Sequence, residues 1–291
     1  MGNLKEIRTR ITSIESTQKI TSSMKLVSAA KLRRAQTAIQ HLRPYSQKLN
    51  EILANLASST GTEQMPLFQQ REPEKVVIVA ITSNKGLCGA FNSNIIKTVN
   101  HLIEEKYAEQ NRAGNLRLIC IGKKGNDQLG KNYPVALSNE KLLDNPDFTE
   151  LSAIADDLVM QFLNHELDKV DIVYNQFLNA ATQRVTVEEY LPVAPIESDG
   201  EHKTNSDYII EPSPEQLLQE LIPRILRTQF YKTLSDSIAS EHGARMTSMT
   251  KATDNATEIL RELRLKYNNA RQSSITNELI EIVSGADALN G

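Results

Sequence analysis

The stretch VVIVAITSNKGLCGAFN, residues 76–92, decides the fold because it changes the hydrophobic period of the chain. Its first six residues form a continuous apolar run, the pattern of a strand that is buried on both faces. A loop with two glycines follows, and the next segment, SNIIKTVNHLIEEKYAE, has the pattern of a helix. A buried strand, a loop and a helix in this order indicate an α/β domain.

The residues after this stretch continue the alternation of strand and helix. Such alternation predicts a parallel or mixed sheet with helices packed on it, a Rossmann-like domain over residues 74–195. A polar, proline-rich connector is expected at 196–213. The further elements expected in the domain are a strand at 116–121 that ends at Gly122, a helix at 149–167, and strands at 171–174 and 183–187.

The N-terminal segment, residues 1–60, has the pattern of one long helix. Apolar residues recur at steps of three and four, and glycine is absent after Gly2. Pro44 should kink this helix without ending it, because both flanks remain helical in composition. At 1.5 Å per residue the helix would be roughly 80 Å long. The expected apolar stripe consists of Leu4, Ile7, Ile11, Ile14, Met24, Val27, Ala35 and Ile39.

The C-terminal segment, residues 214–285, predicts a second long helix. Ser213, Pro214 and Gln216 form a start signal of N-cap, first-turn proline and capping box. Ser284-Gly285 should supply the stop. A helix this long points to a coiled coil, so the two terminal helices should pair antiparallel. The expected seam is Ile238, His242, Arg245, Met249, Ala252, Ala256, Ile259, Leu263, Lys266, Ala270 and Ser273.

Composition and charge limit the class of protein. Apolar residues make up 40% of the 291 residues and charged residues 24%, which is ordinary for a globular protein. No run of 18 apolar residues and no secretory signal is present, and two cysteines suggest packed, reduced thiols. Residues 1–60 carry ten Lys and Arg against three Glu, a net charge of +7, whereas residues 61–211 carry −9. The chain therefore has a basic arm and an acidic middle.

A nucleotide-dependent enzyme is one alternative for the α/β domain. The loop GLCGA follows the first strand, but it lacks the GxxxxGK[ST] pattern of a phosphate loop and the GxGxxG pattern of a dinucleotide site. Cys88 could act as a nucleophile at a helix N-terminus, yet no histidine lies near it in sequence. The five histidines have no metal-ligand spacing. A tight turn and a buried thiol are the favoured interpretations.

A nucleic-acid-binding coiled coil is the second alternative. The stretch MKLVSAAKLRRAQ, residues 24–36, carries four basic side chains. Placed on a helix, these charges point in several directions and do not form the single stripe that groove binding needs. The same spread disfavours a membrane-surface helix. A narrow apolar line with charge elsewhere better suits a two-helix shaft.

Four motifs together resemble the gamma subunit family of the rotary ATP synthase. They are MGNLKEIRTRI…TQKIT…MKLVSAAKLRRAQ, then TSNKGLCGAFN, then SEHGARMTSMTKATDNA, and finally YNNARQSSITNELIEIVSGADAL. They cover both ends and the start of the middle domain in the family's order. Residues 125–210 agree only in general character.

The resemblance implies a non-catalytic rotor without a cofactor, in which an antiparallel coiled coil carries an α/β domain. Such a rotor stands inside the ring of alpha and beta subunits, and its foot meets the epsilon subunit and the membrane ring of c subunits. It couples proton flow to ATP synthesis or hydrolysis. The absence of a transit peptide favours a bacterial source, with the complex at the cytoplasmic face of the inner membrane as a peripheral assembly.

The resemblance also assigns contact residues. Met24 and Lys25 match positions beside an acidic beta-subunit loop, and Arg271, Gln272 and Thr276 match residues that bind a beta-subunit catch loop. Contacts of the foot with epsilon or the c ring are expected from Lys31, Arg33, Arg34, Tyr208 and Glu211.

The chain also departs from the family's pattern. Leu26 and Ser28 are mild changes, whereas Asn84, Lys85 and Ala90 replace Asp, Arg and Gly in the first loop and leave any ionic contact there in question. Gly243 stands where Ala is usual, which should soften the helix by roughly 0.5–1 kcal/mol. The cysteine-bearing insertion of chloroplast relatives is absent, so thiol control is not expected.

Overall fold

The computed structural model describes residues 2–60, 65–193 and 213–290. The described chain divides into two compact units. One unit comprises residues 1–28 and 246–291, and the other comprises residues 29–245. The long helices α1 (Gly2–Thr60) and α7 (Pro214–Asn290) each contribute to both units.

The unit of residues 29–245 contains a five-stranded mixed sheet in the order β3-β2-β1-β4-β5. The first four strands of that order are parallel, and β5 pairs antiparallel with β4. The expected mixed sheet is therefore confirmed. The strands are β1 (Val76–Ile81), β2 (Leu116–Ile121), β3 (Val135–Asn139), β4 (Lys169–Phe177) and β5 (Gln183–Leu191).

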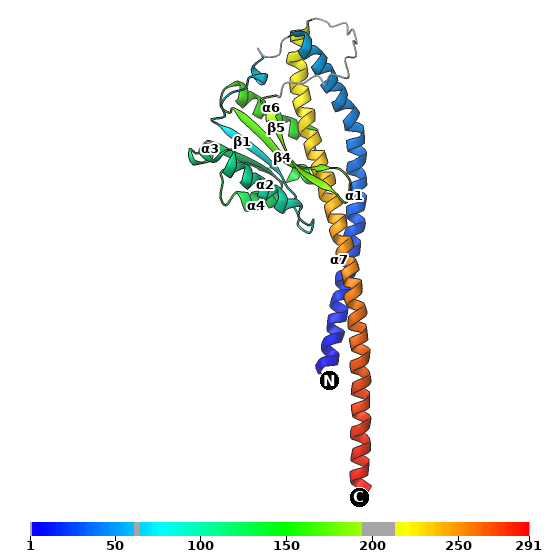
Figure 1. Cartoon of the computed structure of the whole chain (residues 1–291). Helices are drawn as coiled ribbons and strands as arrows, with labels where there is room; N and C mark the ends of the chain where they lie inside the picture. The colour runs from blue at the N-terminus through cyan, green and yellow to red at the C-terminus, as the bar shows by residue number, and fades with distance from the viewer. Residues whose placement is uncertain (1, 61–64, 194–212, 291) are drawn as a thin grey trace. The chain divides into compact units, whose positions relative to one another are not determined.

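Helices cover both faces of this sheet, with α2 and α4 on one face and α6 on the other (Figure 1). Alternate residues of β1 point to the two faces: Ile78 packs with α2, and Val79 belongs to the cluster that contains α6. All of β1 is buried, as its apolar run requires. The shorter elements are η2 (Pro66–Phe68), α2 (Phe91–Glu105), α3 (Ala108–Arg112), α4 (Lys123–Leu129), α5 (Lys141–Asp144) and α6 (Phe148–Leu163).

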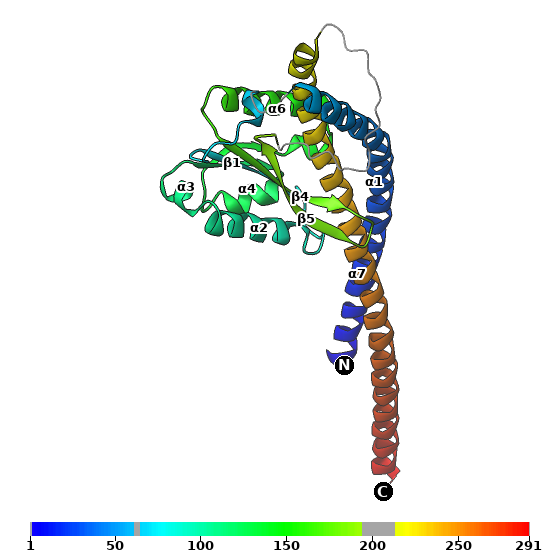
Figure 2. The same cartoon turned by 45° about the horizontal axis from the view of Figure 1, so that its top comes forward.

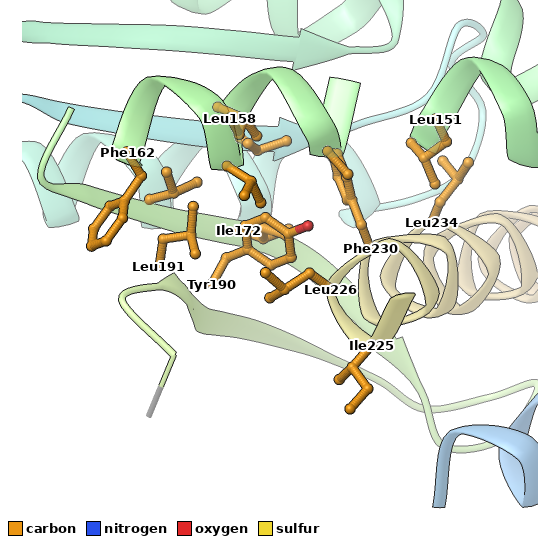
Figure 3. Close-up of a cluster of buried hydrophobic side chains, with 14 of the residues drawn as sticks. Leu151, Leu158, Phe162, Ile172, Tyr190, Leu191, Ile225, Leu226, Phe230 and Leu234 are labelled. Atoms are coloured by element: carbon orange, nitrogen blue, oxygen red, sulfur yellow. The ribbon is translucent and has the colours of Figure 1, made fainter. Parts of the chain in front are cut away.

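The largest core cluster joins the sheet to α6 and to the first half of α7. Figure 3 shows Phe230 and Leu234 of α7 pointing toward the residues of α6, with Tyr190 of β5 beside Phe230. The rings of Tyr190 and Phe230 lie 5.6 Å apart between centroids. Leu49 and Leu53 of α1 extend the same cluster. Both long helices are thus packed to the sheet domain within this unit.

The long helices confirm some predictions of their ends and correct others. α1 continues through Pro44 to Thr60, and Figure 2 shows it bending in its final turns. The hydroxyl of Ser213 accepts a hydrogen bond from the Gln216 amide at 3.3 Å, as an N-cap should. The predicted stop at Ser284-Gly285 is wrong, because α7 runs on to Asn290 with Gly285 in helical conformation.

The sheet domain also contains elements that the sequence did not predict. β3 was missed because its residues are mostly exposed and form no apolar run. β4 and β5 are longer than expected, and α6 ends at Leu163, before the left-handed His165 with φ 60°.

The unit of residues 1–28 and 246–291 is a helix pair with a partly polar seam. Thr21 accepts a hydrogen bond from Thr253 at 2.9 Å, and Gln18 donates to Thr257 at 2.7 Å. Arg264 forms an ion pair with Glu15 at 2.7 Å. These contacts run in opposite chain directions along α1 and α7, which confirms the antiparallel pairing.

The expected seam is shifted at several positions. Val27 is 58% exposed and Ser28 is 3% exposed, so the small side chain, not the apolar one, faces inward. On α7, Ile259 is exposed and Leu260 is buried. Likewise Tyr267 and Ser274 are less exposed than the expected Lys266 and Ser273. Apolar neighbours such as 259 and 260 cannot be distinguished by hydrophobicity alone.

Candidate partner-contact surfaces

The loop between β1 and α2 is held by a compact set of internal hydrogen bonds. Asn92 Oδ1 accepts from the Ser83 amide at 2.9 Å, and Asn92 Nδ2 donates to Ser83 Oγ at 2.8 Å. Ser83 Oγ in turn donates to the Lys85 carbonyl at 2.7 Å. Leu87 and Gly89 both have positive φ, so the chain reverses sharply here. The predicted tight turn is confirmed.

Arg245 of α7 fastens this loop to the helix. Its guanidinium donates to the carbonyl oxygens of Lys85 at 2.9 Å and Gly86 at 3.3 Å. It also forms an ion pair with Glu241 at 2.6 Å, and both side chains are at least 90% buried. One planar side chain thus satisfies a carboxylate and two loop carbonyls, an arrangement that suits the fork geometry of the arginine guanidinium.

Helix α7 is hydrogen-bonded to the loop after β1 and to β4 near its carboxyl end. In open α/β sheets the connections diverge at one pair of neighbouring strands, and ligands bind beside the carboxyl ends of that pair. Here those neighbours are β1 and β4. Arg245 binds the loop after β1, and Ser240 Oγ donates to the carbonyl of Asn175 in β4 at 2.9 Å. A helix of the same chain therefore lies at the position where ligands bind in such sheets.

Burial governs the ionisable groups around Arg245. Burial raises the pKa of the Glu241 carboxyl, and the nearby Arg245 opposes that rise. Burial, together with the positive charges of Arg245 and Lys31, lowers the pKa of His242 to about 4. His242 is therefore neutral at physiological pH, as expected for a packed side chain.

The candidate nucleophile Cys88 lacks the environment of a reactive thiol. Its side chain is buried, and burial raises its pKa. Reactive cysteines have the opposite shift.

Within residues 2–60, 65–193 and 213–290, no three His, Cys, Asp or Glu side chains gather as a metal site. Along the same ranges, no helix has the length and apolar character needed to cross a bilayer.

The expected beta-subunit contacts all lie in the helix-pair unit. Met24 and Lys25 are half-buried on α1, whereas Arg271, Gln272 and Thr276 are exposed on α7. Thr276 Oγ1 donates to the Gln272 carbonyl at 2.9 Å. Because Thr21 pairs with Thr253, the two sets are separated along the helix axis by about 30 Å. The structure therefore does not bring them into one site.

The expected foot contacts are placed only in part. Lys31, Arg33 and Arg34 are exposed on α1 in the unit of residues 29–245. Lys31 is close enough to α7 that its charge lowers the pKa values of Glu241 and His242. Tyr208 and Glu211 lie outside the described residues.

Sequence reasoning missed the fastening role of Arg245 and two further features. Asn84, which replaces an acidic residue of the family pattern, donates to the Glu140 carbonyl at 2.8 Å and to Asp144 at 3.2 Å, so the loop keeps a polar contact without an ion pair of its own. The last turns of α7 expose Ile275, Leu279, Ile280, Ile282 and Val283. The run ITNELIEIV was a readable signal for this surface, because apolar residues there outnumber what one seam needs.

The chain combines a Rossmann-like sheet domain with two long helices, and helix α7 lies where ligands bind in such domains. This combination is typical of a structural stalk protein. The ATP synthase family model matches residues 3–289. Curated ATP synthase gamma chains from Flavobacterium johnsoniae and Christiangramia forsetii are 52% and 50% identical, each over the whole of both chains. The chain therefore belongs to the ATP synthase family, among the gamma chains, which are non-catalytic stalk subunits.

Solved structures agree with this assignment. A chain in the central stalk and c-ring structure of Tetrahymena thermophila mitochondrial ATP synthase matches with a TM-score of 0.57 and 26% identity, over 80% of this chain and 99% of that one. A chain of Euglena gracilis mitochondrial ATP synthase has a TM-score of 0.66 at 20% identity, over 99% of this chain and 95% of that one. The second likeness concerns the fold alone.

Proposed function

We propose that the chain is the torque-transmitting shaft of a proton-translocating ATP synthase. It turns with the membrane c ring inside the alpha and beta subunits and so couples proton flow to ATP synthesis or hydrolysis. The observation that carries the proposal is whole-length identity of 52% to a gamma chain, together with the antiparallel helix pair. The chemistry belongs to the partners, and this chain links two distant sites mechanically.

The proposed partners divide between the two units. The helix-pair unit contacts beta subunits through Met24, Lys25, Arg271, Gln272 and Thr276. Lys31, Arg33, Arg34, Tyr208 and Glu211 contact epsilon or the c ring. Cationic and exposed polar side chains support these assignments, because an acidic partner loop would attract them and favour docking. We propose a peripheral location at the cytoplasmic face of a bacterial inner membrane.

The proposed organisation gives each segment one task. Residues 1–60 and the helix Pro214–Asn290 form the shaft, residues 74–195 form the domain that stiffens its base, and residues 196–213 connect the two. The packing of Phe230 and Leu234 against α6 supports this division, since it anchors α7 to the domain.

Purification of the complex from membranes tests the proposal. A tagged chain should recover alpha, beta, epsilon and c subunits in fixed stoichiometry, and ATP hydrolysis by the complex should rotate a bead attached to this chain. Recovery of the chain alone from membranes that contain intact synthase would contradict it. Micromolar ATP binding by the purified chain would favour a nucleotide-dependent enzyme instead. Salt-dependent DNA binding by residues 1–60 would favour the nucleic-acid alternative.

A further inference from the structure

The turn between β4 and β5 lies against α7 at a position where the helix has no side chain. A Cβ placed on Gly243 would stand 3.1 Å from the carbonyl oxygen of Ala180 and 3.4 Å from its Cα. Gly243 is buried. The backbone of the turn therefore lies directly against the helix at Gly243, and a side chain added there would push the turn outward by a few tenths of an ångström or more.

The turn that makes this contact is stiffened by its own hydrogen bonds. Asn179 Oδ1 accepts from the amides of Ala181 at 3.0 Å and Thr182 at 2.8 Å. Gln183 Nε2 donates to the Ala180 carbonyl at 3.1 Å. An asparagine that bonds its own backbone in this way fixes the local conformation. The turn therefore presents a defined surface to the helix.

A second contact lies one helical turn away on the same face of α7. Ser240 Oγ donates to the Asn175 carbonyl at 2.9 Å, and both residues are buried. Residues 240 and 243 are neighbours on a helix surface. If α7 turned about its own axis, Ser240 would leave its acceptor and the backbone of residue 243 would leave the turn. Contacts made through long side chains could follow such a rotation by changing rotamer.

We propose that the turn 178–182 braces α7 at Gly243 and fixes the rotational setting of this helix in its domain. The inference rests on the proposed rotor function in one respect: a helix that transmits torque must not rotate about its axis relative to the domain that it is packed against. Gly243 is then a positioning residue, kept small so that the turn can reach the helix backbone.

Hydrogen exchange of the full-length chain tests the brace with a matched control. Gly243→Val should force the turn outward and speed exchange of the Ala181 and Thr182 amides about ten-fold, the effect of one lost hydrogen bond. Gly285→Ala is the control, because that glycine lies in the same helix with nothing within 4 Å of an added Cβ. It should leave the turn unchanged. Unaltered exchange in Gly243→Val would overturn the proposal.

A second variant keeps the test decisive if Gly243→Val unfolds the domain. Asn179→Ala loosens the turn and leaves α7 intact. With a brace, exchange in residues 240–245 of α7 should rise, while the buried strand β1 keeps its protection. If exchange in 240–245 stays as in the wild type, Arg245 and Ser240 hold the helix without help from the turn, and the proposal fails.

A final measurement separates the brace from the rotor function. In the assembled complex, the angular fluctuation of a bead on a halted rotor should widen in Asn179→Ala and not in Gly285→Ala. Changed exchange without wider fluctuation would retain the brace and contradict its part in torque transmission. Failure of the wild-type chain to assemble with the c ring would instead contradict the rotor function itself.

Discussion

Replacing Arg245 with alanine is the most informative perturbation of the sheet-domain unit. The guanidinium holds the Glu241 carboxylate at 2.6 Å and two loop carbonyls at 2.9 and 3.3 Å. Arg245→Ala leaves Glu241 buried without its counter-charge, since the residue is only 8% exposed. Removing one partner of a buried ion pair costs about 3–5 kcal/mol. We expect the free energy of unfolding to fall by that amount at pH 8.

The loss should depend on pH in a defined direction. Burial already raises the pKa of Glu241, and Arg245 opposes the rise, so the variant raises that pKa further. A carboxyl with a raised pKa in the folded state binds protons more tightly when folded, and stability therefore increases as pH falls through that pKa toward the pKa of the unfolded chain. The deficit of Arg245→Ala should shrink between pH 8 and pH 5. Glu241→Gln in the same background should remove most of the deficit at pH 8.

Urea unfolding followed by circular dichroism measures these differences. Arg264→Ala is the control, because its ion pair with Glu15 has a similar distance of 2.7 Å but is largely exposed. An exposed pair contributes about 0–1 kcal/mol. If Arg245→Ala costs no more than Arg264→Ala, or if its cost is the same at both pH values, the argument from a buried ion pair is wrong.

Three further predictions concern separate residues. Tyr107→Phe should destabilise the chain by about 1–3 kcal/mol in urea unfolding, because the phenol donates at 2.6 Å to the buried Asp171; a change under 0.5 kcal/mol, the size seen at ordinary surface positions, would contradict this. His242 should contribute a loss of stability as pH falls from 6.5 toward 4, since its pKa is lowered to about 4, chiefly by burial, and the unfolded state takes up the proton first, whereas Glu241 with its raised pKa contributes in the opposite direction. His242→Gln should lose less over that window, and equal pH profiles would refute the role of His242. Met24→Lys should strengthen attraction to an acidic beta-subunit loop and lower the protons pumped per ATP hydrolysed without impairing assembly, and an unchanged ratio would argue against that contact.

The sequence was sufficient for those parts of the fold that depend on hydrophobic period. The run from Val76 to Ile81 predicted a buried strand, and the spacing of Leu4, Ile7, Ile11 and Ile14 predicted a helix face; both are confirmed. The exposed edge strand β3 carried no such signal. The seam was shifted where Ser28 and Thr21 face inward, because close helix approach favours small side chains that hydrophobicity does not mark.

The contacts of Arg245 and Gly243 were less predictable than the helices and strands, because they join residues that are far apart in the sequence. Arg245 is joined to residues 85 and 86 across 160 positions of sequence, and no local pattern reports such a contact. Gly243 looked like a weak point of the helix when judged by propensity. Its closeness to Ala180 becomes visible only once the sheet is folded. Family resemblance supplied candidate contacts that the fold of one chain alone does not test.

Helix α7 lies where a free ligand would bind in a sheet of this kind, and its covalent connection to the sheet determines how often that position is occupied. A free ligand occupies its site in proportion to its concentration, whereas a covalently joined segment binds at a high effective concentration that the surroundings do not alter. The contacts of α7 with the loop after β1 and with β4 are therefore made at any cellular concentration of nucleotide or metabolite. For a protein that would turn beside nucleotide-binding neighbours, the stiffness that these contacts give to the domain then does not depend on the surrounding ATP concentration.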